Sequence, residues 1–497
     1  TNAKAALKAT QEEWRRRILD NIQVLTPDDD FNLLVNGWMK YQIYINNHWG
    51  RSASFYHEGS GEFGYRNTAQ DAFGITSFNP RFAKEILLKL ASIQRSSGQV
   101  LPGWSLVSGV NTGRPTSDFP MWLPFLLISY IKETGDFEIL QKSIEFFDGG
   151  EASLYEHAIR AMNFLADIQK GERGLPLMET QDWNDAFDRV GIEGRGESVM
   201  LAMGLVWALE DFSKLAYHLK DMGLAQSCLA KAQQLKDILN HQCWDGEWYV
   251  RAYTDYGEVI GSSRNEEGKI YANTQSWAIL SRTADTDRME KILQAIDTHL
   301  ETPYGPVMFA PPYTRYDSHL GRITGFAPGT KENAAIFSHV GAFKVVADIV
   351  AGRAEKAYRI FHQLLPISDA KDPDVHKTEP YVFSEYVIGP GNPRYGEGAF
   401  SWLTGTAAWM FVAATQWILG IRPTYTGLLI DPCIPSYWEA FEVRRPFRGD
   451  VYQITVENSK RVERGIQKLF LDGIQVEPPV IIPKCDGKVH QVKAIMG

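Results

Sequence analysis

Helical periodicity over about four hundred residues constrains the fold of this chain more than any other feature. From about Phe31 to Leu419, apolar residues recur with the spacing of one helix face in segment after segment. The segment Arg81–Gln94 places several on one face: Phe82, Ile86, Leu90 and Ile93. The same spacing predicts further helices at Pro120–Ile131, Leu154–Ile168, Glu197–Leu219, Leu224–Leu239, Thr274–Leu280, Arg288–Leu300, Asn333–Val350, Glu355–Leu364 and Ser401–Leu419.

Many of these helices come in pairs joined by Gly/Pro-rich or aromatic loops. Two helices per unit over so long a stretch indicate either an open helical solenoid or a closed α/α toroid. The sequence shows no regular repeat, so we expect the closed toroid. Because 497 residues exceed what one small core needs, one large domain with one or two minor ones is expected.

The two ends of the chain differ from this helical body. Residues 1–30 form a predicted helix, Ala3–Asn21, followed by a turn. After Gly420 the chain becomes rich in short β segments, with hairpin turns at Arg448-Gly449-Asp450 and Leu471-Asp472-Gly473. Inside the body, Trp244–Val250 reads as one strand ribbon. The predicted fold is therefore mainly α, with a helical linker over 1–30, a helical domain over 31–420 and a small β domain over 421–497.

Composition and charge exclude several classes of function. The formal net charge is −9 and there is no Lys/Arg block, which disfavours nucleic-acid binding. No apolar stretch is long enough to span a membrane. The cysteines form no CxxC pair and have no zinc-ligand spacing, so we read them as buried free thiols in a reducing, cytoplasmic compartment: Cys228, Cys243, Cys433 and Cys485. The chain opens at Thr1 without a Met or a signal peptide, and we expect that an N-terminal region is missing.

The run Gln181-Asp182-Trp183-Asn184-Asp185 is the strongest functional signal in the chain. It places an aromatic ring beside two carboxylates, and a ring can stack on a pyranose while an acid protonates a glycosidic oxygen. The ordinary alternative is that Asp182 or Asp185 caps the next helix. A Gly-rich stretch separates both acids from the predicted helix start at Glu197, so we favour a functional role.

Two more polar segments precede apolar helices. Gly329-Thr330-Lys331-Glu332-Asn333 leads to His339, which we place about two turns into a helix and near a pocket mouth. The non-functional alternative for Lys331 and Glu332 is a solvated salt bridge that contributes little to stability. The corresponding alternative for His339 is a core histidine whose hydrogen bonds are satisfied within the protein. Thr404 and Gly405 stand in a Ser/Thr/Gly-rich helix start, which suits an oxyanion but is a weak signal alone.

The sequence contains no HExxH, Walker A or GxSxG motif, so metal, nucleotide and serine-hydrolase chemistry have no support. We therefore expect no metal and no organic cofactor.

Together these segments resemble the inverting disaccharide phosphorylases of glycoside hydrolase family 94, such as cellobiose and chitobiose phosphorylases. The resemblance runs through essentially the whole chain and includes the following motifs: Asn36–Gln42, Arg51–Ser54, Gly64–Asp71, Asp182–Asp185, Asn273–Trp277, Gly329–His339, Trp402–Gly405 and Ile430–Pro435. It implies a helical linker, an (α/α)6 barrel, a C-terminal jelly-roll-like domain, a homodimer, and an N-terminal β-sandwich that this chain lacks.

The resemblance also implies roles for individual residues. Asp185 matches the general acid, and Trp183 lines the subsite of the transferred sugar. Four residues match phosphate-binding positions: Arg51, His339, Thr404 and Gly405. The remaining matches are to substrate-binding positions: Arg66, Asn67, Asp71, Lys331 and Glu332. Asn67 departs from the family, which often has Asp there to hold sugar hydroxyls, and this bears on the identity of the donor sugar.

The predicted reaction is inverting phosphorolysis of a β-linked disaccharide or oligosaccharide, with inorganic phosphate as co-substrate and an α-sugar 1-phosphate as product. Asp185 must be protonated to act, so we expect apolar surroundings such as Trp183 to favour its neutral form. Two alternatives remain open: an inverting hydrolase with Glu332 or Glu379 as base, and a non-catalytic sugar-binding protein.

Overall fold

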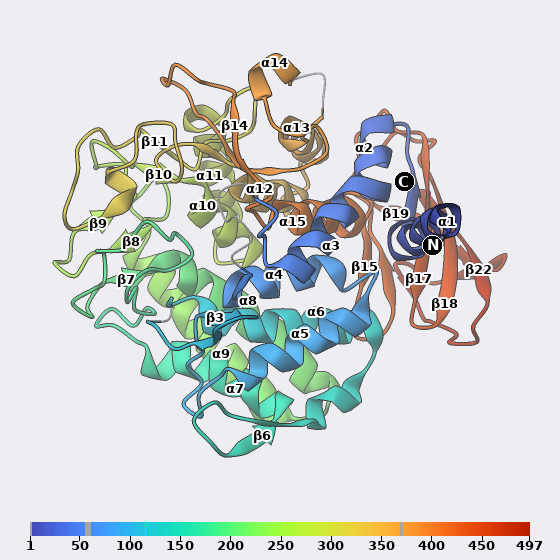
Figure 1. Ribbon diagram of the computed structural model, residues 1–497, viewed down its shortest axis with the longest axis horizontal. Coiled ribbons are helices and arrows are strands. Elements are labelled where there is room, and N and C mark those ends of the chain that lie inside the picture. The colour runs from blue at the N-terminus through green and yellow to red at the C-terminus, as the bar shows by residue number, and fades with distance from the viewer. Residues whose placement is uncertain (1, 55–60, 115, 368–370) are drawn as a thin grey trace.

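The computed structural model describes residues 2–54, 61–114, 116–367 and 371–497. Within these residues the fold mixes helix and sheet (Figure 1), so the expectation of a mainly α chain does not hold. Short strands occupy many loops between the helices, because those loops pair with one another over two to four residues. None of the helices in this described part combines the length and apolar content needed to cross a bilayer.

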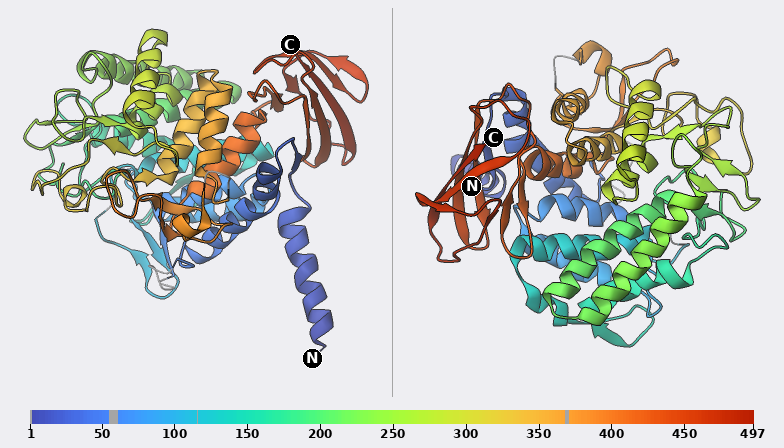
Figure 2. Two further views of the ribbon diagram at one scale, coloured as in Figure 1. Left: turned by 90° about the horizontal axis from the view of Figure 1, so that it is seen from above. Right: turned by 180° about the vertical axis from the view of Figure 1, so that it is seen from behind.

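Six helices of the described chain form a closed ring in which each contacts the next and the last contacts the first. In order they are α4 (Tyr65–Ile75), α6 (Trp122–Thr134), α8 (Val199–His218), α10 (Ala272–Leu280), α12 (Ser338–Val350) and α15 (Thr406–Val412). These helices are buried on nearly every side, which explains why apolar residues cover most of their surface. Figure 2 shows them inside a layer of other helices.

The surrounding helices are amphipathic, and each packs its apolar face on the ring. They are α3 (Met39–Trp49), α5 (Pro80–Ser92), α7 (Leu154–Asn163), α9 (Met222–Gln242), α11 (Thr286–His299) and α13 (Ala354–Leu364). In α13 one face is buried through Ala357, Tyr358, Ile360, Phe361 and Leu364, while charged residues lie on the other. The 3.6-residue period of the sequence therefore records which face of each outer helix meets the ring.

The start of the chain combines one helix with one strand. The helix α1 (Ala3–Trp14) has no buried residue and projects from the body in Figure 2. A short π-helix, Arg15–Leu19, follows it, and the strand β1 (Gln23–Leu25) comes next. Lys40 is fully buried, and its ammonium donates to the carbonyls of Ile18 and Ile22 at 2.5 and 2.8 Å, which fastens the end of this segment to α3. The helix α2 (Asp29–Leu33) and the short π-helix Leu34–Trp38 then lead into α3.

A six-stranded sheet gathers most of the last sixty residues together with β1. Its order is β1-β17-β18-β22-β19-β20, with β17 (Ala440–Phe447), β18 (Asp450–Glu457), β22 (Val489–Met496), β19 (Ile466–Leu471) and β20 (Ile474–Val476). Buried and exposed residues alternate along β17 and β18, as a sheet with one covered face requires. The two predicted hairpin turns lie between β17 and β18 and between β19 and β20.

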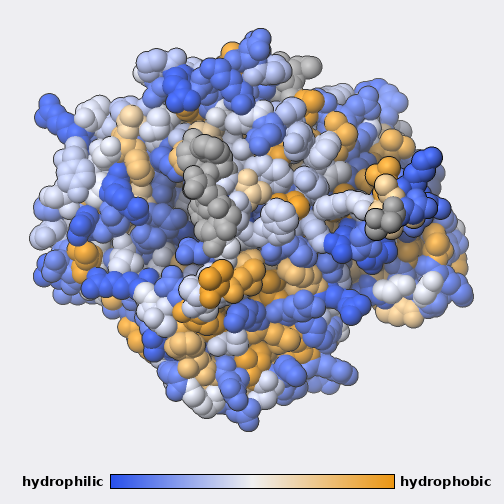
Figure 3. Space-filling model, in the orientation of Figure 1, coloured by the Kyte–Doolittle hydropathy of each residue, from blue (hydrophilic) through white to orange (hydrophobic). Residues whose placement is uncertain are grey.

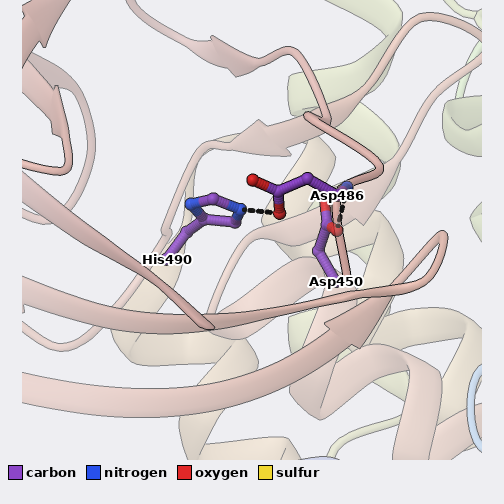
Figure 4. Close-up of side chains that lie close together, drawn as sticks. All are labelled: Asp450, Asp486 and His490. Carbon is purple, nitrogen blue, oxygen red and sulfur yellow. Dashed lines mark hydrogen bonds and ion pairs between the residues drawn. The ribbon is translucent and has the colours of Figure 1, made fainter. Parts of the chain in front are cut away.

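Hydrogen bonds organise a cluster of Asp450, Asp486 and His490 at one end of this sheet (Figure 4). The carboxylate of Asp450 accepts from the backbone N–H groups of residues 485, 486 and 487 at 2.7 to 2.9 Å. The two ring nitrogens of His490 lie 2.8 Å from Asp472 and 3.0 Å from Asp486. These contacts hold the 485–487 turn against the sheet and account for the grouping of the three side chains.

The other strands are short and belong to loops. They are β2 (Glu62–Gly64), β3 (Gly103–Ser105), β4 (Gly109–Asn111), β5 (Ser143–Glu145), β6 (Glu151–Ser153), β7 (Glu197–Ser198), β8 (Ala252–Tyr253), β9 (Val259–Ile260), β10 (Ile270–Tyr271), β11 (Phe309–Ala310), β12 (Ile336–Phe337), β13 (Ser384–Val387), β14 (Gly398–Ser401), β15 (Ile421–Pro423), β16 (Leu428–Ile430) and β21 (Val480–Ile481). The predicted ribbon at 244–250 reduces to one bridge, between Trp244 and Tyr249.

Three local expectations are corrected. The helix α12 begins at Ser338, so His339 is its second residue rather than two turns inside it. The helix predicted from Ser401 begins at Thr406, because β14 pairs with β13 before it. Cys485 is exposed, while the other three cysteines are buried; all four lie in the described residues and form no disulfide.

Candidate active site

Most of the predicted site residues lie at the N-terminal ends of the ring helices. Arg66 is the second residue of α4, His339 the second residue of α12, and Gly405 immediately precedes α15. The Asp182–Asp185 loop precedes β7, which leads into α8. Since N–H groups point out of helix N-termini, this end of the ring is electropositive and suits an anion.

Asp185 is the accessible acid of this site. Its side chain is 53% exposed, and its Oδ1 atom accepts hydrogen bonds from Arg66 at 2.6 Å and from Gln181 at 2.8 Å. Trp183 is buried and directs its ring to His339 and Phe343, at 5.4 Å between centroids in both cases. The expected apolar surroundings of Asp185 are therefore wrong, because an arginine and an amide face its carboxylate.

Asp182 holds the loop in place through its hydrogen bonds. Its carboxylate accepts from Arg251 at 2.7 Å and from the hydroxyl of Ser198 at 2.6 Å. Although burial opposes it, Arg251 holds the pKa of Asp182 below its usual value, with Ser198 contributing a hydrogen bond. Ser198, not either acid, caps α8 by accepting from the N–H of Leu201 at 3.1 Å. The capping alternative for Asp182 and Asp185 is therefore excluded.

Arg66 links three parts of the site. Its guanidinium is buried and lies 3.3 Å from Asp118, 2.6 Å from Asp185 and 3.1 Å from the carbonyl of Asp182. Burial raises the pKa of Asp118 to about 6, and Arg66 works against that shift. Asp118 also accepts from the indole of Trp122 at 2.8 Å. One arginine thus balances two carboxylates, one buried and one open to solvent.

Arg51, His339 and Gly405 meet beside Trp183. A Cβ atom on Gly405 would lie 2.7 Å from Nη2 of Arg51 and 3.0 Å from Cε1 of His339, so a side chain there would close the space between them. Arg51 is buried and pairs with Asp71 through two bonds of 2.8 and 3.0 Å. Its backbone is left-handed, at φ 61°. The arrangement presents a guanidinium, an imidazole and a bare backbone to one small space.

The imidazole of His339 is buried, and its Nε2 atom has no hydrogen-bond partner among the described residues. Burial, with Arg51 and Arg66 nearby, lowers the pKa of His339 well below its ordinary value, so the ring is neutral at physiological pH. An unpaired buried nitrogen costs free energy unless a ligand satisfies it. Thr404 lies next to Gly405; its hydroxyl pairs with Thr406 at 2.6 Å, and its carbonyl accepts from Asn46 at 2.9 Å.

Lys331 and Glu332 point to different partners. The ammonium of Lys331 lies 3.2 Å from Glu385 and over the ring of Phe400. Glu332 is buried and accepts from the amide of Asn184 at 2.9 Å and from the N–H of Ala186 at 3.0 Å, so it holds the Asp185 loop from below. Burial raises the pKa of Glu332 to about 8, and the charge of Asp185 adds to the shift.

Glu332 gives a testable dependence of stability on pH. Between the ordinary value of 4.5 and about 8, the unfolded chain releases this proton while the folded chain keeps it, so stability falls as pH rises through that window. Glu332→Gln removes the titration. We expect the melting temperature of Glu332→Gln to rise relative to wild type from about pH 5 to about pH 8 and then level off.

The matched control is Glu397→Gln. Lys377 and Arg394 lower the pKa of Glu397, so its contribution is lost only as pH falls below the ordinary carboxyl range. Its melting difference from wild type should stay flat across the window where the Glu332 difference changes. A Glu332→Gln difference that is equally flat would show that Glu332 is ionised throughout.

Three residues that contact the predicted site were not predicted as site residues from the sequence. Arg251, Asp118 and Glu385 are all buried or nearly so and contact the predicted residues. No local pattern marks them: Arg251 stands between two apolar residues, Asp118 and Glu385 each follow a serine, and all three gain their partners only through folding. Glu379, one of the two bases considered for hydrolysis, accepts from the indole of Trp402 at 3.2 Å.

Comparison with known proteins identifies the family. The family model described as "Glycosyl hydrolase 94 superfamily, catalytic domain" matches residues 13–420. Solabiose phosphorylase of Paenibacillus borealis is 39% identical over 478 residues, which are 96% of this chain and 60% of that protein. N,N′-diacetylchitobiose phosphorylase of Vibrio proteolyticus is 33% identical over 524 residues, or 100% of this chain and 64% of that protein. The chain thus spans less than two thirds of the length of these relatives.

Solved structures of low sequence identity share the fold. The GH78 family rhamnosidase of Bacillus sp. GL1 superposes with a TM-score of 0.60 at 14% identity, over 96% of this chain and 44% of that chain. A bacterial glucoamylase complexed with acarbose gives a TM-score of 0.50 at 14% identity, over 78% of this chain and 56% of that one. The family match spans the ring helices, with His339 on α12, and the loops that carry Asp185 and Arg51, and the chain belongs to the glycosyl hydrolase 94 superfamily.

Proposed function

We propose that this chain carries out inverting phosphorolysis of a β-linked disaccharide or oligosaccharide, or the reverse synthesis. The observation that supports this most is the pairing of one solvent-open acid, Asp185, with a nearby space bounded by Arg51, His339 and Gly405. An inverting hydrolase needs a second carboxylate to activate water. Phosphate is already an anionic nucleophile and needs only a site that binds and orients it.

In this mechanism Asp185 protonates the leaving glycosidic oxygen, and phosphate attacks the anomeric carbon from the opposite face. The bond from that carbon to the glycosidic oxygen breaks as the bond to phosphate oxygen forms, giving an α-sugar 1-phosphate. Arg51 and the N–H groups around Gly405 bind phosphate, and Nε2 of the neutral His339 shares a hydrogen bond with it. Thr404 completes this group, and Trp183 backs the sugar subsite.

The sugar itself is bound by the residues around Asp185. We assign Arg66, Asn67 and Asp71 on α4, with Lys331 and Glu332 on the opposite loop, to substrate binding. Arg66 also sets the orientation of the Asp185 carboxylate through their 2.6 Å ion pair. No metal or organic cofactor takes part in this scheme.

Hydrolysis is the less favoured alternative. Glu332 has both carboxylate oxygens engaged by Asn184 and Ala186, and Glu379 is bound to the indole of Trp402. Neither is free to activate a water opposite Asp185. A purely sugar-binding role is also less favoured, because it gives no reason for the orphaned nitrogen of His339 beside Arg51.

Phosphate dependence tests the proposal. We expect β-linked disaccharides to yield an α-sugar 1-phosphate only when inorganic phosphate is present, as followed by proton and phosphorus NMR. In reverse, a panel of sugar 1-phosphates and acceptors should release phosphate. Release of free reducing sugar at the same rate with and without phosphate would establish the hydrolase instead.

The architecture proposed with this function has three parts. Residues 1–30 form a helical linker, 31–420 an (α/α)6 barrel whose inner layer is the helix ring, and 421–497 a jelly-roll-like β domain. The chain works in the cytoplasm, in keeping with its unpaired cysteines. A homodimer, or an N-terminal β-sandwich region, covers exposed apolar surface such as Leu106 and Val107. Figure 3 shows hydrophobic residues gathered over the part of the face where β3 and α5 lie.

Asn67 carries a prediction about the donor sugar. It is half-buried on α4 next to Arg51, and its side chain has no hydrogen-bond partner among the described residues. A carboxylate there would accept from two sugar hydroxyls, whereas the amide offers one acceptor and one donor. A charged hydrogen bond also contributes about 1.5–3 kcal/mol against about 1 for a neutral one. We therefore expect poor use of glucose 1-phosphate, or preference for a donor altered at the hydroxyl that faces Asn67.

Initial rates with glucose 1-phosphate and other hexose 1-phosphates, for wild type and Asn67→Asp, measure this. We expect Asn67→Asp to shift preference toward glucose 1-phosphate. If glucose 1-phosphate is already the best donor of wild type and Asn67→Asp changes nothing, Asn67 does not select the sugar.

A further inference from the structure

A cavity of about 540 Å³ lies at the end of the helix ring opposite Asp185. All six ring helices contribute to its walls, from their middle and C-terminal parts: Phe73, Ser129, Trp207, Trp277, Val346 and Trp409. The turn after β15 closes one side through Thr424 and Tyr425. The volume is within the range of small-molecule sites, and none of the residues assigned to the reaction lines it.

Aromatic rings separate this cavity from the catalytic end. Phe343 lies 5.5 Å from Trp277 and 4.8 Å from His339, and Trp409 lies 5.9 Å from His339, between ring centroids. Trp277 and Trp409 line the cavity, while His339 belongs to the other site. The two sites therefore share a wall of packed rings but no space.

Trp277, which lines the cavity, carries a buried donor that is unsatisfied. Trp277 is 2% exposed, and its Nε1–H has no hydrogen-bond partner among the described residues. By contrast, the indole of Trp409 donates to Gln70 at 2.9 Å. Buried donors without an acceptor are rare because each loses its hydration without replacement. A ligand whose acceptor reaches this N–H would remove the cost.

The rim of the cavity is cationic, although the chain as a whole carries a net charge of −9. Five basic side chains and two acidic ones line it, an excess of three positive charges: Lys132, Lys214, Arg282, Arg422, Arg464, Glu210 and Asp211. Asp211 engages both lysines, and Asp431 engages Arg422 and Arg464. Arg282 is exposed, and its guanidinium has no ion-pair or hydrogen-bond partner within the described chain.

We propose that this cavity binds a phosphorylated hexose. Its phosphate would pair with Arg282 at the rim, where a charge-assisted hydrogen bond is strong. Its pyranose ring would pack against Trp207, which is partly exposed, with a hydroxyl accepting from Trp277. The proposal is independent of the reaction at Asp185, because it depends on other residues and on the opposite end of the ring.

Titration calorimetry with glucose 6-phosphate on the full chain tests the proposal. We expect binding with a Kd below about 1 mM, and weaker binding of glucose alone and of inorganic phosphate alone. Arg282→Gln should weaken glucose 6-phosphate binding by about tenfold, as loss of one charged hydrogen bond implies. Trp277→Phe keeps the ring and removes the donor, so it should weaken binding as well; its melting temperature shows whether the chain stays folded.

Arg51→Gln is the matched control, because it removes an arginine from the catalytic end. It should leave the affinity for glucose 6-phosphate unchanged. The proposal is overturned if no binding is detected up to about 10 mM ligand, far weaker than ordinary ligand affinities. It is also overturned if Arg51→Gln, and not Arg282→Gln, abolishes binding, or if inorganic phosphate binds as tightly as the sugar phosphate.

Discussion

Asp185→Asn is expected to lower the rate of phosphorolysis by about two to four decades, the usual share of general acid catalysis. The amide keeps the shape of the side chain and can still accept from Gln181, but it has no proton to give to the leaving oxygen. Arg66 retains Asp118 as a partner, so the site should stay assembled. Steady-state kcat gives the loss, and calorimetry with the disaccharide should show nearly unchanged affinity.

Asp188→Asn is the control for this variant. Asp188 lies three residues away in the same loop and pairs with Arg322 at 3.0 Å. Its neutralisation should change kcat by less than about threefold, in line with a surface ion pair of little energetic value. Near-normal turnover in Asp185→Asn would assign the acid role to another group. Asp182 is no candidate for it, because Arg251 and Ser198 occupy its carboxylate.

Arg51→Gln is expected to reduce kcat/KM for phosphate by about a hundredfold or more. The variant loses a charged hydrogen bond to phosphate, and it leaves Asp71 buried without its cation, which adds to the disturbance. The effect should appear mainly in the KM for phosphate, because the sugar contacts lie around Asp185. Initial rates at varied phosphate and fixed disaccharide separate a change in the KM for phosphate from a change in kcat.

Arg445→Gln controls for the general cost of deleting a buried arginine. Arg445 lies on β17 of the C-terminal sheet, is not among the residues assigned to phosphate or sugar, and pairs with Glu133 at 2.6 Å. It should lower the melting temperature without changing the KM for phosphate. If Arg51→Gln changes only stability, as Arg445→Gln does, then Arg51 is a structural partner of Asp71 and the phosphate lies elsewhere.

Much of the architecture could be predicted because it depends on local patterns. The apolar period located most of the ring and outer helices to within a few residues but missed α3 and α4, and the Gly-containing hairpin turns located the bends between β17 and β18 and between β19 and β20. Errors occurred where a strand paired across the chain before a helix began. The residues before α12 and α15 read as helix from composition, but β12 and β14 both pair with β13 there.

The site, like the fold, could be predicted only in part from the sequence. The acid of the Asp182–Asp185 loop, the histidine of α12 and the glycine before α15 were all singled out from residue type and resemblance, and the structure gathers them at one end of the ring. Which of the two acids is open to solvent could not be read from the loop, since that depends on Arg251, which is 69 residues beyond Asp182. The resemblance to family 94 is confirmed by the family match.

The order of the amino acids sets the helical period, the turn positions and the chemical types present at each motif. Which charges meet, which are buried and which remain unpaired follow from the folded arrangement. The physical reason is that the pKa of Glu332, the neutrality of His339 and the orphaned indole of Trp277 depend on desolvation and on partners brought together from distant segments. The cavity at the opposite end of the ring arises in the same way, because six helices each contribute to its wall.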